Sequence, residues 1–274
     1  MRRFLLNPAA AFLEQRMKIF PFNPAEEPDE REPFAVEGLP GYSLSQELVS
    51  RVLRGAGREE CYLAARSSGI LPPLAAGKLA FDAAWNSSSL FAATVEPLLG
   101  ETLERLTIDL TLDRFRITGT LDGINSGTHL RWRYAGIKGK DRLSIWLDHL
   151  LLNLLSPPGF PRESLMIASD ISMRLSAVDN PAGILLDLLE LYDEGMLRPL
   201  PFFPQTSWEF LTGGMGRAIK SWQGEERIGI PGESGDTAVG ICFAGQEPLG
   251  EEFRLLAGRV YAPLQAAVKE EKLS

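Results

Sequence analysis

The chain has 274 residues, of which 45% are hydrophobic and 23% charged, so it has an ordinary globular composition and enough length for a substantial core. Its net charge of -8 argues against nucleic-acid binding over the whole surface but leaves room for a local basic groove. Without a run of 18 apolar residues it should not cross a membrane, and Cys61 and Cys242, which form no CxxC pair, favour a reducing, cytoplasmic setting.

The N-terminal residues 1–20 are predicted to form one helix. Asn7 can cap it, because its side chain can accept a hydrogen bond from a free N–H of the first turn, and Pro8 suits the first helical position. Residues 21–41 follow with five prolines and the acidic run PAEEPDEREP. This composition predicts an extended, solvated connector. The acidic run could alternatively bind a basic partner.

Three helical stretches follow, over residues 43–54, 59–67 and 77–106. The first is amphipathic, and Ser43 with Gln46 three residues later matches a capping box at its start. In the third, breaks are expected near the serines at 87–89 and at Pro97. These segments predict a mainly helical lobe over residues 1–106.

Alternating apolar and polar residues then predict three short strands, over 107–112, 115–121 and 129–134. Turn-forming residues separate them, among them Asn125-Ser126-Gly127 before the third strand. We expect these strands to be adjacent in one sheet, as an antiparallel meander at its centre. Asp122 stands at the end of the second strand, beside a glycine-containing stretch.

A strongly helical stretch over residues 141–155 follows, with Asp141 as its expected cap and a wide leucine-rich face that should pack on the sheet. It contains His149, which could be a ligand or general base, or simply a core histidine. The second interpretation is favoured, since no other His, Cys or carboxylate stands beside it at metal-ligand spacing.

The remaining elements complete a sheet flanked by helices. We expect a hairpin over 165–168 and 172–178, a helix over 182–194 after Asn180-Pro181, an extended segment at 199–204, a short helix at 207–212, a long irregular segment over 213–245, and a closing helix over 248–269 broken at Pro263. The order indicates an α/β or α+β fold in a single domain, 1–274, made of the helical lobe, a sheet core at 107–212 and a closing region at 213–274.

Several segments resemble known proteins. FLLNPAAAFLEQRM resembles the opening helix of nuclease domains in RecB-like and AddB-like proteins, with Asn7 in place of their cysteine. Six segments, in the family's order and spacing, resemble the C-terminal domain of the RecC family: EPFAVEGLPGYSLSQELV, ITGTLDGI, HLRWRYA with KGKDRLSIWLDHL, LYDEGMLRPLPFFP, WQGEERIGIPGESGD and FAG.

The resemblance implies a restriction-endonuclease-like central mixed sheet flanked by helices, in a domain that has lost its nuclease chemistry. It also implies a role in exodeoxyribonuclease V, the RecBCD helicase–nuclease of DNA repair and recombination. There the region helps to hold the complex together with RecB, contacts RecD and lies near the path of the DNA. The resemblance further implies that the chain is a fragment, because family members carry a long helicase-like region before this point.

The residues allow an independent test of that lost chemistry. A nuclease of this type holds Mg²⁺ with an Asp at a strand end and a second acid on the next strand, followed two residues later by Lys. Asp122 matches the first position, but no carboxylate occurs from Thr128 to Lys140. We therefore expect Asp122 to be a degenerate nuclease position, with no catalytic residue, metal or cofactor. The alternative is an active Mg²⁺ nuclease that draws a second acidic cluster from elsewhere in the fold.

The same region carries a cluster of cations: Arg131, Arg133, Lys138, Lys140 and Arg142. Only Asp141 opposes them within that stretch, so we expect a basic patch that contacts DNA, weakly in isolation, or a partner. Trp132 and Tyr134 should point to the opposite face of the strand, into the core. The alternatives are a solvated edge and a pure interaction scaffold that does not touch DNA.

Overall fold

The computed structural model describes residues 1–21, 38–225 and 230–273, so most of the expected 21–41 connector lies outside the described residues. The helices are α1 (Arg2–Leu6), α2 (Pro8–Ala11), η1 (Phe12–Met17), α3 (Gly38–Leu53), α4 (Arg58–Ser67), α5 (Leu74–Val95), η3 (Glu96–Leu98), α6 (Gly139–Leu155), α7 (Pro181–Gly195), α8 (Pro204–Gln223), η5 (Glu233–Gly235), α9 (Thr237–Cys242) and α10 (Glu251–Ala267). The strands are β1 (Leu106–Leu112), β2 (Phe115–Leu121), β3 (His129–Trp132), β4 (Ser164–Ile167), β5 (Ile171–Leu175), β6 (Gly224–Glu225), β7 (Ile230–Pro231) and β8 (Val268–Lys272).

These elements form a mixed α/β fold around a four-stranded sheet of order β3-β4-β5-β8. Strands β3 and β4 are parallel, and α6 makes the crossover between them. The other pairs, β4 with β5 and β5 with β8, are antiparallel. The expected hairpin of β4 and β5 is thereby confirmed, as is a helix between β3 and β4.

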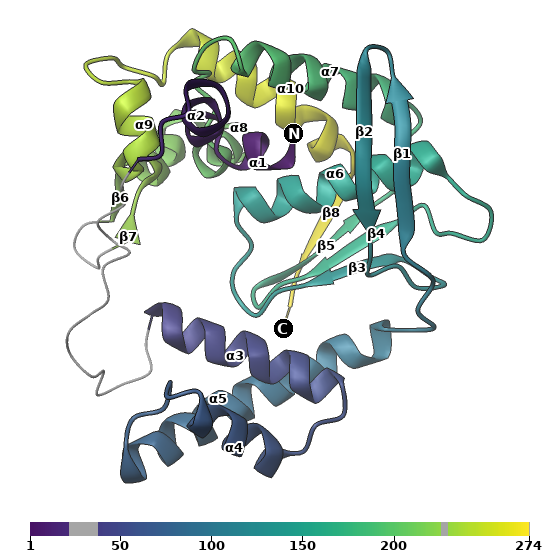
Figure 1. The fold of residues 1–274 in the computed structure, drawn as a ribbon, viewed down its shortest axis with the longest axis vertical. Helices are drawn as coiled ribbons and strands as arrows, with labels where there is room; N and C mark the ends of the chain where they lie inside the picture. Colours follow the sequence, from purple (N-terminus) through teal and green to yellow (C-terminus); the bar gives the residue numbers. More distant parts are fainter. Residues whose placement is uncertain (22–37, 226–229, 274) are drawn as a thin grey trace.

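The sheet is covered on both faces, and residue alternation along its strands decides which core each side chain joins (Figure 1). Leu165 and Ile167 of β4 pack against α3 and α5, whereas Met166 between them joins the core formed by α6, α7 and α10. Leu130 of β3 also faces α3 and α5. The odd-numbered residues of β3 therefore point toward α6.

The predicted three-stranded meander is wrong. Strands β1 and β2 pair as expected, but they form a separate two-stranded sheet, and β3 belongs to the four-stranded one. The chain turns away after β2, where Gly123 adopts a left-handed φ of +72°. Asn125 then fixes the turn: its carboxamide oxygen accepts the N–H groups of Gly127 and Thr128, and its amide nitrogen donates to the carbonyls of Leu98 and Leu99.

The N-terminal helix and the helical lobe match the sequence-based prediction only in part. Asn7 caps α2 by accepting the N–H of Ala10, as expected, but the same residue interrupts the predicted single helix of 1–20. The expected capping box at Ser43 is wrong, because α3 already begins at Gly38. Helix α5 also runs without the expected break at residues 87–89, whereas the break expected at Pro97 is confirmed, because α5 ends at Val95 and η3 includes Pro97.

The C-terminal third departs most from expectation. The predicted short helix at 207–212 is part of the 20-residue helix α8, which changes direction at Gly214, where φ is +75°. The segment 213–245 is therefore not irregular in its described part, because it holds the end of α8, β6, β7 and α9. The predicted break at Pro263 is wrong, because α10 runs through this proline as one continuous helix. The helix ends at Ala267 and is followed by β8, which completes the sheet.

Candidate functional site

Asp122 lies directly after β2 and is bound to an arginine of β3. Its side chain is 54% exposed, and its Oδ1 lies 2.8 Å from Nη1 of Arg131. Nη2 of the same arginine donates to Oδ2 of Asp148, on α6, at 3.2 Å. The guanidinium of Arg131 thus lies between two carboxylates that come from different elements.

Asp148 is the buried member of this group, with a side chain that is 3% exposed. It contacts Arg2 as well as Arg131, so two guanidinium groups meet one carboxylate. Burial raises the pKa of the Asp148 carboxyl, and the two arginines oppose that rise. Within the described residues, no group of three or more His, Cys, Asp and Glu side chains is arranged to hold a metal ion.

The chain's two histidines lie in the core beside this group. The Oγ of Ser164 lies between them, 2.9 Å from Nδ1 of His149 and 3.2 Å from Nδ1 of His129. Burial lowers the pKa of His129 to about 3 and that of His149 to about 4. His149 also hydrogen-bonds the carbonyl of Ser176 and stacks on Trp146. These contacts favour the interpretation of His149 as a core histidine.

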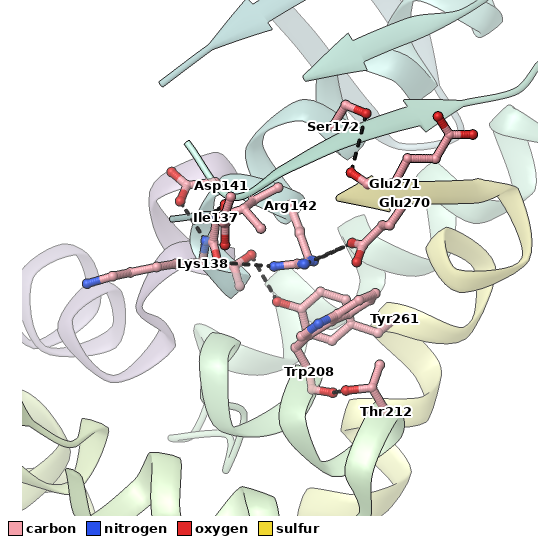
Figure 2. Close-up of polar contacts among 12 residues, drawn as sticks. Ile137, Lys138, Asp141, Arg142, Ser172, Trp208, Thr212, Tyr261, Glu270 and Glu271 are labelled. Carbon is pink, nitrogen blue, oxygen red and sulfur yellow. Dashed lines mark hydrogen bonds and ion pairs between the residues drawn. The ribbon is translucent and has the colours of Figure 1, made fainter. Parts of the chain in front are cut away.

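The five predicted cations do not form one surface patch. Arg142 is buried: Figure 2 shows its guanidinium directed at Glu270 of β8, to which it donates at 2.8 and 3.0 Å. It also lies over the ring of Trp208, 4.5 Å from the centroid. Arg133 is paired with Asp141 and lies over the ring of Tyr42. With Arg131 held by Asp122, all three arginines have partners inside the fold.

The two lysines differ from the arginines. Lys138 and Lys140 are exposed, and neither has an ion pair with a described residue. In Figure 2 the side chain of Lys138 extends away from the Arg142 cluster. Lys138 occupies the N-cap position of α6, where Asp141 was expected, and Asp141 stands at the third helical position with its carboxylate accepting the Lys138 N–H.

Both lysines line a cleft in the described part of the chain, with a volume of about 1250 Å³. Its walls are the start of α2, the start of α6, the two ends of α8 and the segment around η5 and α9. The lining includes Lys220 and Arg217 of α8 and five carboxylates, namely Glu14, Glu209, Glu225, Glu233 and Asp236. The cleft is therefore mixed in charge.

Trp132 and Tyr134 pack against α3 and α5, as the alternation of the strand predicts. The backbone N–H of Tyr134 donates to the side chain of Gln46 on α3, a residue expected from the sequence to serve in a helix cap.

Sequence reasoning missed Asp148 and Glu270, the acids that pair with Arg131 and Arg142. A lone Asp within the leucine-rich run of α6 was the available signal for the first of them.

Comparison with known proteins places this geometry in a family context. The profile of the RecC C-terminal domain matches residues 1–214. The chain is 29% identical over 218 residues to RecBCD enzyme subunit RecC of Escherichia coli (strain K12), covering 77% of this chain and 19% of that protein. It is 26% identical over 263 residues to RecBCD enzyme subunit RecC of Mycobacterium tuberculosis (strain CDC 1551 / Oshkosh), covering 86% of this chain and 24% of that protein.

The matched region thus spans about a fifth to a quarter of these curated relatives. Among the helices in the described ranges, none is both long and apolar enough to cross a membrane.

Proposed function

Because the chain belongs to the RecC C-terminal domain family, we propose that it is a non-catalytic, nuclease-like domain that serves in a RecBCD-type helicase–nuclease during DNA repair and recombination. In this proposal the central mixed sheet is restriction-endonuclease-like. The domain contacts RecB and RecD subunits and helps to guide DNA, and the nuclease activity of the assembly resides in another part of it.

The observation that carries the non-catalytic proposal is the position of Arg131 between Asp122 and Asp148. A divalent cation would need those carboxylate oxygens as ligands, since Mg²⁺ takes oxygen donors in near-octahedral geometry. A guanidinium bound to both carboxylates competes for the same oxygens and repels a second cation. Arg2 adds another positive charge on Asp148. The acidic pair is therefore used for holding β2, β3 and α6 together.

The order of elements supports the nuclease-like fold. The hairpin of β1 and β2 is followed by β3, and α6 then crosses over to the parallel strand β4. Asp122 stands at a strand end beside this crossover, where the resemblance expects the first metal ligand. The proposed arrangement keeps the scaffold and replaces the metal with an internal cation.

A cleavage assay tests the lack of catalysis. We expect the chain to leave linear duplex and single-stranded DNA intact in Mg²⁺ or Mn²⁺, and its calorimetric titration with Mn²⁺ to show no tight site. The Asp122→Ala variant is the matched control, because Asp122 is half exposed and its replacement should preserve the fold. Cleavage that is present in the parent chain and lost in this variant would contradict the proposal and favour an active nuclease.

One observation favours a second candidate, a protein-interaction scaffold that does not touch DNA. Three of the five predicted DNA-binding cations are held in ion pairs within the fold. Only Lys138 and Lys140 therefore remain from that set for phosphate contacts. A salt-dependent DNA titration separates this candidate from the first.

A further inference from the structure

The cleft of about 1250 Å³ has positive groups that the fold does not use. Lys138 and Lys140 stand at the start of α6, and Lys220 stands in the last turn of α8. All three are exposed lysines without an ion pair to any residue in the described ranges. Arg217, the fourth cation of the lining, is paired with Glu209.

The carboxylates of the cleft, in contrast, mostly have partners within the fold. Glu233 accepts the N–H groups of Gln205 and Thr206 at 3.1 and 2.7 Å, and so satisfies the first turn of α8. Asp236 caps α9 and accepts a hydrogen bond from the side chain of Asn7 at 2.9 Å. Glu14 faces Arg3 at 3.4 Å. Glu225 is the one acid of the lining without a partner among the described residues, so the unpaired groups of the cleft are three lysines and one carboxylate.

We propose that this cleft binds a short acidic segment of a partner polypeptide, with carboxylate side chains at Lys138 and Lys140 on one side and at Lys220 on the other. The cleft exceeds the usual 300–1000 Å³ or so of pockets for drug-sized ligands, which suits several residues of extended chain. This binding site would exist whether or not the domain has nuclease chemistry, so it goes beyond the function proposed above.

The charge pattern favours a polypeptide over a single-stranded nucleic acid. A phosphate backbone carries one negative charge on every nucleotide, and it would have to pass the five carboxylates of the lining. A peptide can instead present acids only where the lysines stand and place neutral backbone elsewhere. Single-strand binding also uses exposed aromatic faces, but the aromatic side chains of the lining, Phe202 and Phe203, are 1% and 2% exposed.

Selection from a random peptide library tests the site without assuming a sequence. A phage-displayed library of 10-residue peptides is panned on the full chain, and enriched peptides are synthesised and titrated by fluorescence anisotropy. We expect enriched peptides to be acidic and to bind the Lys138→Glu/Lys140→Glu variant at least tenfold more weakly. Lys220→Glu should weaken the same peptides. Lys78→Glu, an exposed lysine on α5 outside the cleft, is the matched control and should change nothing.

Several outcomes of these experiments would contradict the proposal. No enrichment, enrichment of peptides that are not acidic, or equal affinity for the parent and the cleft variants would overturn the proposal. A 10-nucleotide single strand is titrated in parallel. If it binds more tightly than every selected peptide and loses affinity in Lys138→Glu/Lys140→Glu, the cleft is a nucleic-acid site and the peptide proposal is wrong. Unchanged thermal unfolding of each variant confirms that the exposed substitutions leave the fold intact.

Discussion

The hydroxyl of Ser164 lies 2.9 Å from Nδ1 of His149 in the core, where burial lowers the pKa of the histidine and keeps its ring neutral. Its neighbour His129 shares the same hydroxyl and is also buried. Protonation of either ring would place a charge among apolar side chains and the arginines nearby. The folded state therefore depends on two imidazoles that remain uncharged.

This dependence predicts lower stability in mild acid. An unfolded histidine binds a proton below a pKa of about 6.5, whereas burial lowers the folded pKa values to about 3 for His129 and about 4 for His149. The unfolded state thus takes up protons first as pH falls from 7 to 5. The free energy of unfolding should drop by roughly 2 kcal/mol for each histidine over that range. Urea unfolding at pH 7, 6 and 5 measures it.

The His149→Gln variant is the control for this prediction. It removes one of the two titrating groups, so the loss of stability between pH 7 and pH 5 should be about half that of the parent chain. An equal pH dependence in parent and variant would show that other groups are responsible.

Arg142 should be important for stability rather than for DNA binding. Its side chain is 6% exposed, pairs with Glu270 and covers the ring of Trp208. Arg142→Ala leaves Glu270 without its partner and opens a gap beside α8, so we expect a loss of about 2–4 kcal/mol in urea unfolding. Arg116→Ala, which removes an exposed pair with Asp109 on the hairpin, should cost much less. Similar effects of the two substitutions would contradict this ranking.

The junction of α1 with α7 offers a test of close packing. A Cβ at Gly195, the last residue of α7, would overlap the ring of the buried Phe4. Gly195→Ala should therefore displace α1 and cost about 1–3 kcal/mol. At Gly258, inside α10, an added methyl group would enter open space and φ is not in the left-handed region, so Gly258→Ala should instead stabilise by about 0.5–1 kcal/mol. Thermal unfolding of the two variants, measured side by side, should move in opposite directions.

The sequence predicted individual helices and strands better than it predicted which strands pair with one another. Alternation predicted β1 and β2 correctly, and a change to helical periodicity predicted α6. Periodicity could not predict that β3 belongs to a different sheet from β1 and β2. That separation depends on the hydrogen bonds from the side chain of Asn125 to the backbone after α5. Strand β8 was missed because VKEEK is charged and mostly exposed, with no apolar alternation, and its pairing with β5 joins distant segments.

The candidate site shows the same limit. Arg131, Arg133 and Arg142 form a basic cluster when only residues nearby in the chain are counted. Glu270 lies 128 residues from Arg142 in sequence, and Asp148 belongs to a different element from Arg131. Counting only the charges nearby in the sequence therefore gave too many cations free to bind a ligand. Side-chain direction was predictable where the strand period applied, as Trp132 and Tyr134 show.

These internal ion pairs reduce the salt dependence expected for DNA binding by the chain. A patch of five free cations could neutralise about five phosphates, and the log–log salt slope could then reach about -4 to -5. With three arginines paired inside the fold, Lys138 and Lys140 remain, and the slope for duplex DNA should be no steeper than about -2. Anisotropy titrations of a labelled duplex measure it over a range of about 25 to 200 mM salt, across which screening of exposed charges increases strongly.

Two variants decide between the remaining interpretations of the basic region. Lys138→Glu/Lys140→Glu should abolish any measurable duplex binding without unfolding the chain, because both side chains are exposed. Arg131→Glu/Arg133→Glu should instead lower the stability, since it places acids against Asp122, Asp148 and Asp141. If the lysine variant binds DNA as well as the parent does, the lysines are not phosphate contacts, and a scaffold that meets only protein partners becomes the better account. If the slope is near about -4 or steeper, the arginines leave their internal carboxylates to bind phosphate, and the assignment of Arg131 as an internal cation is wrong.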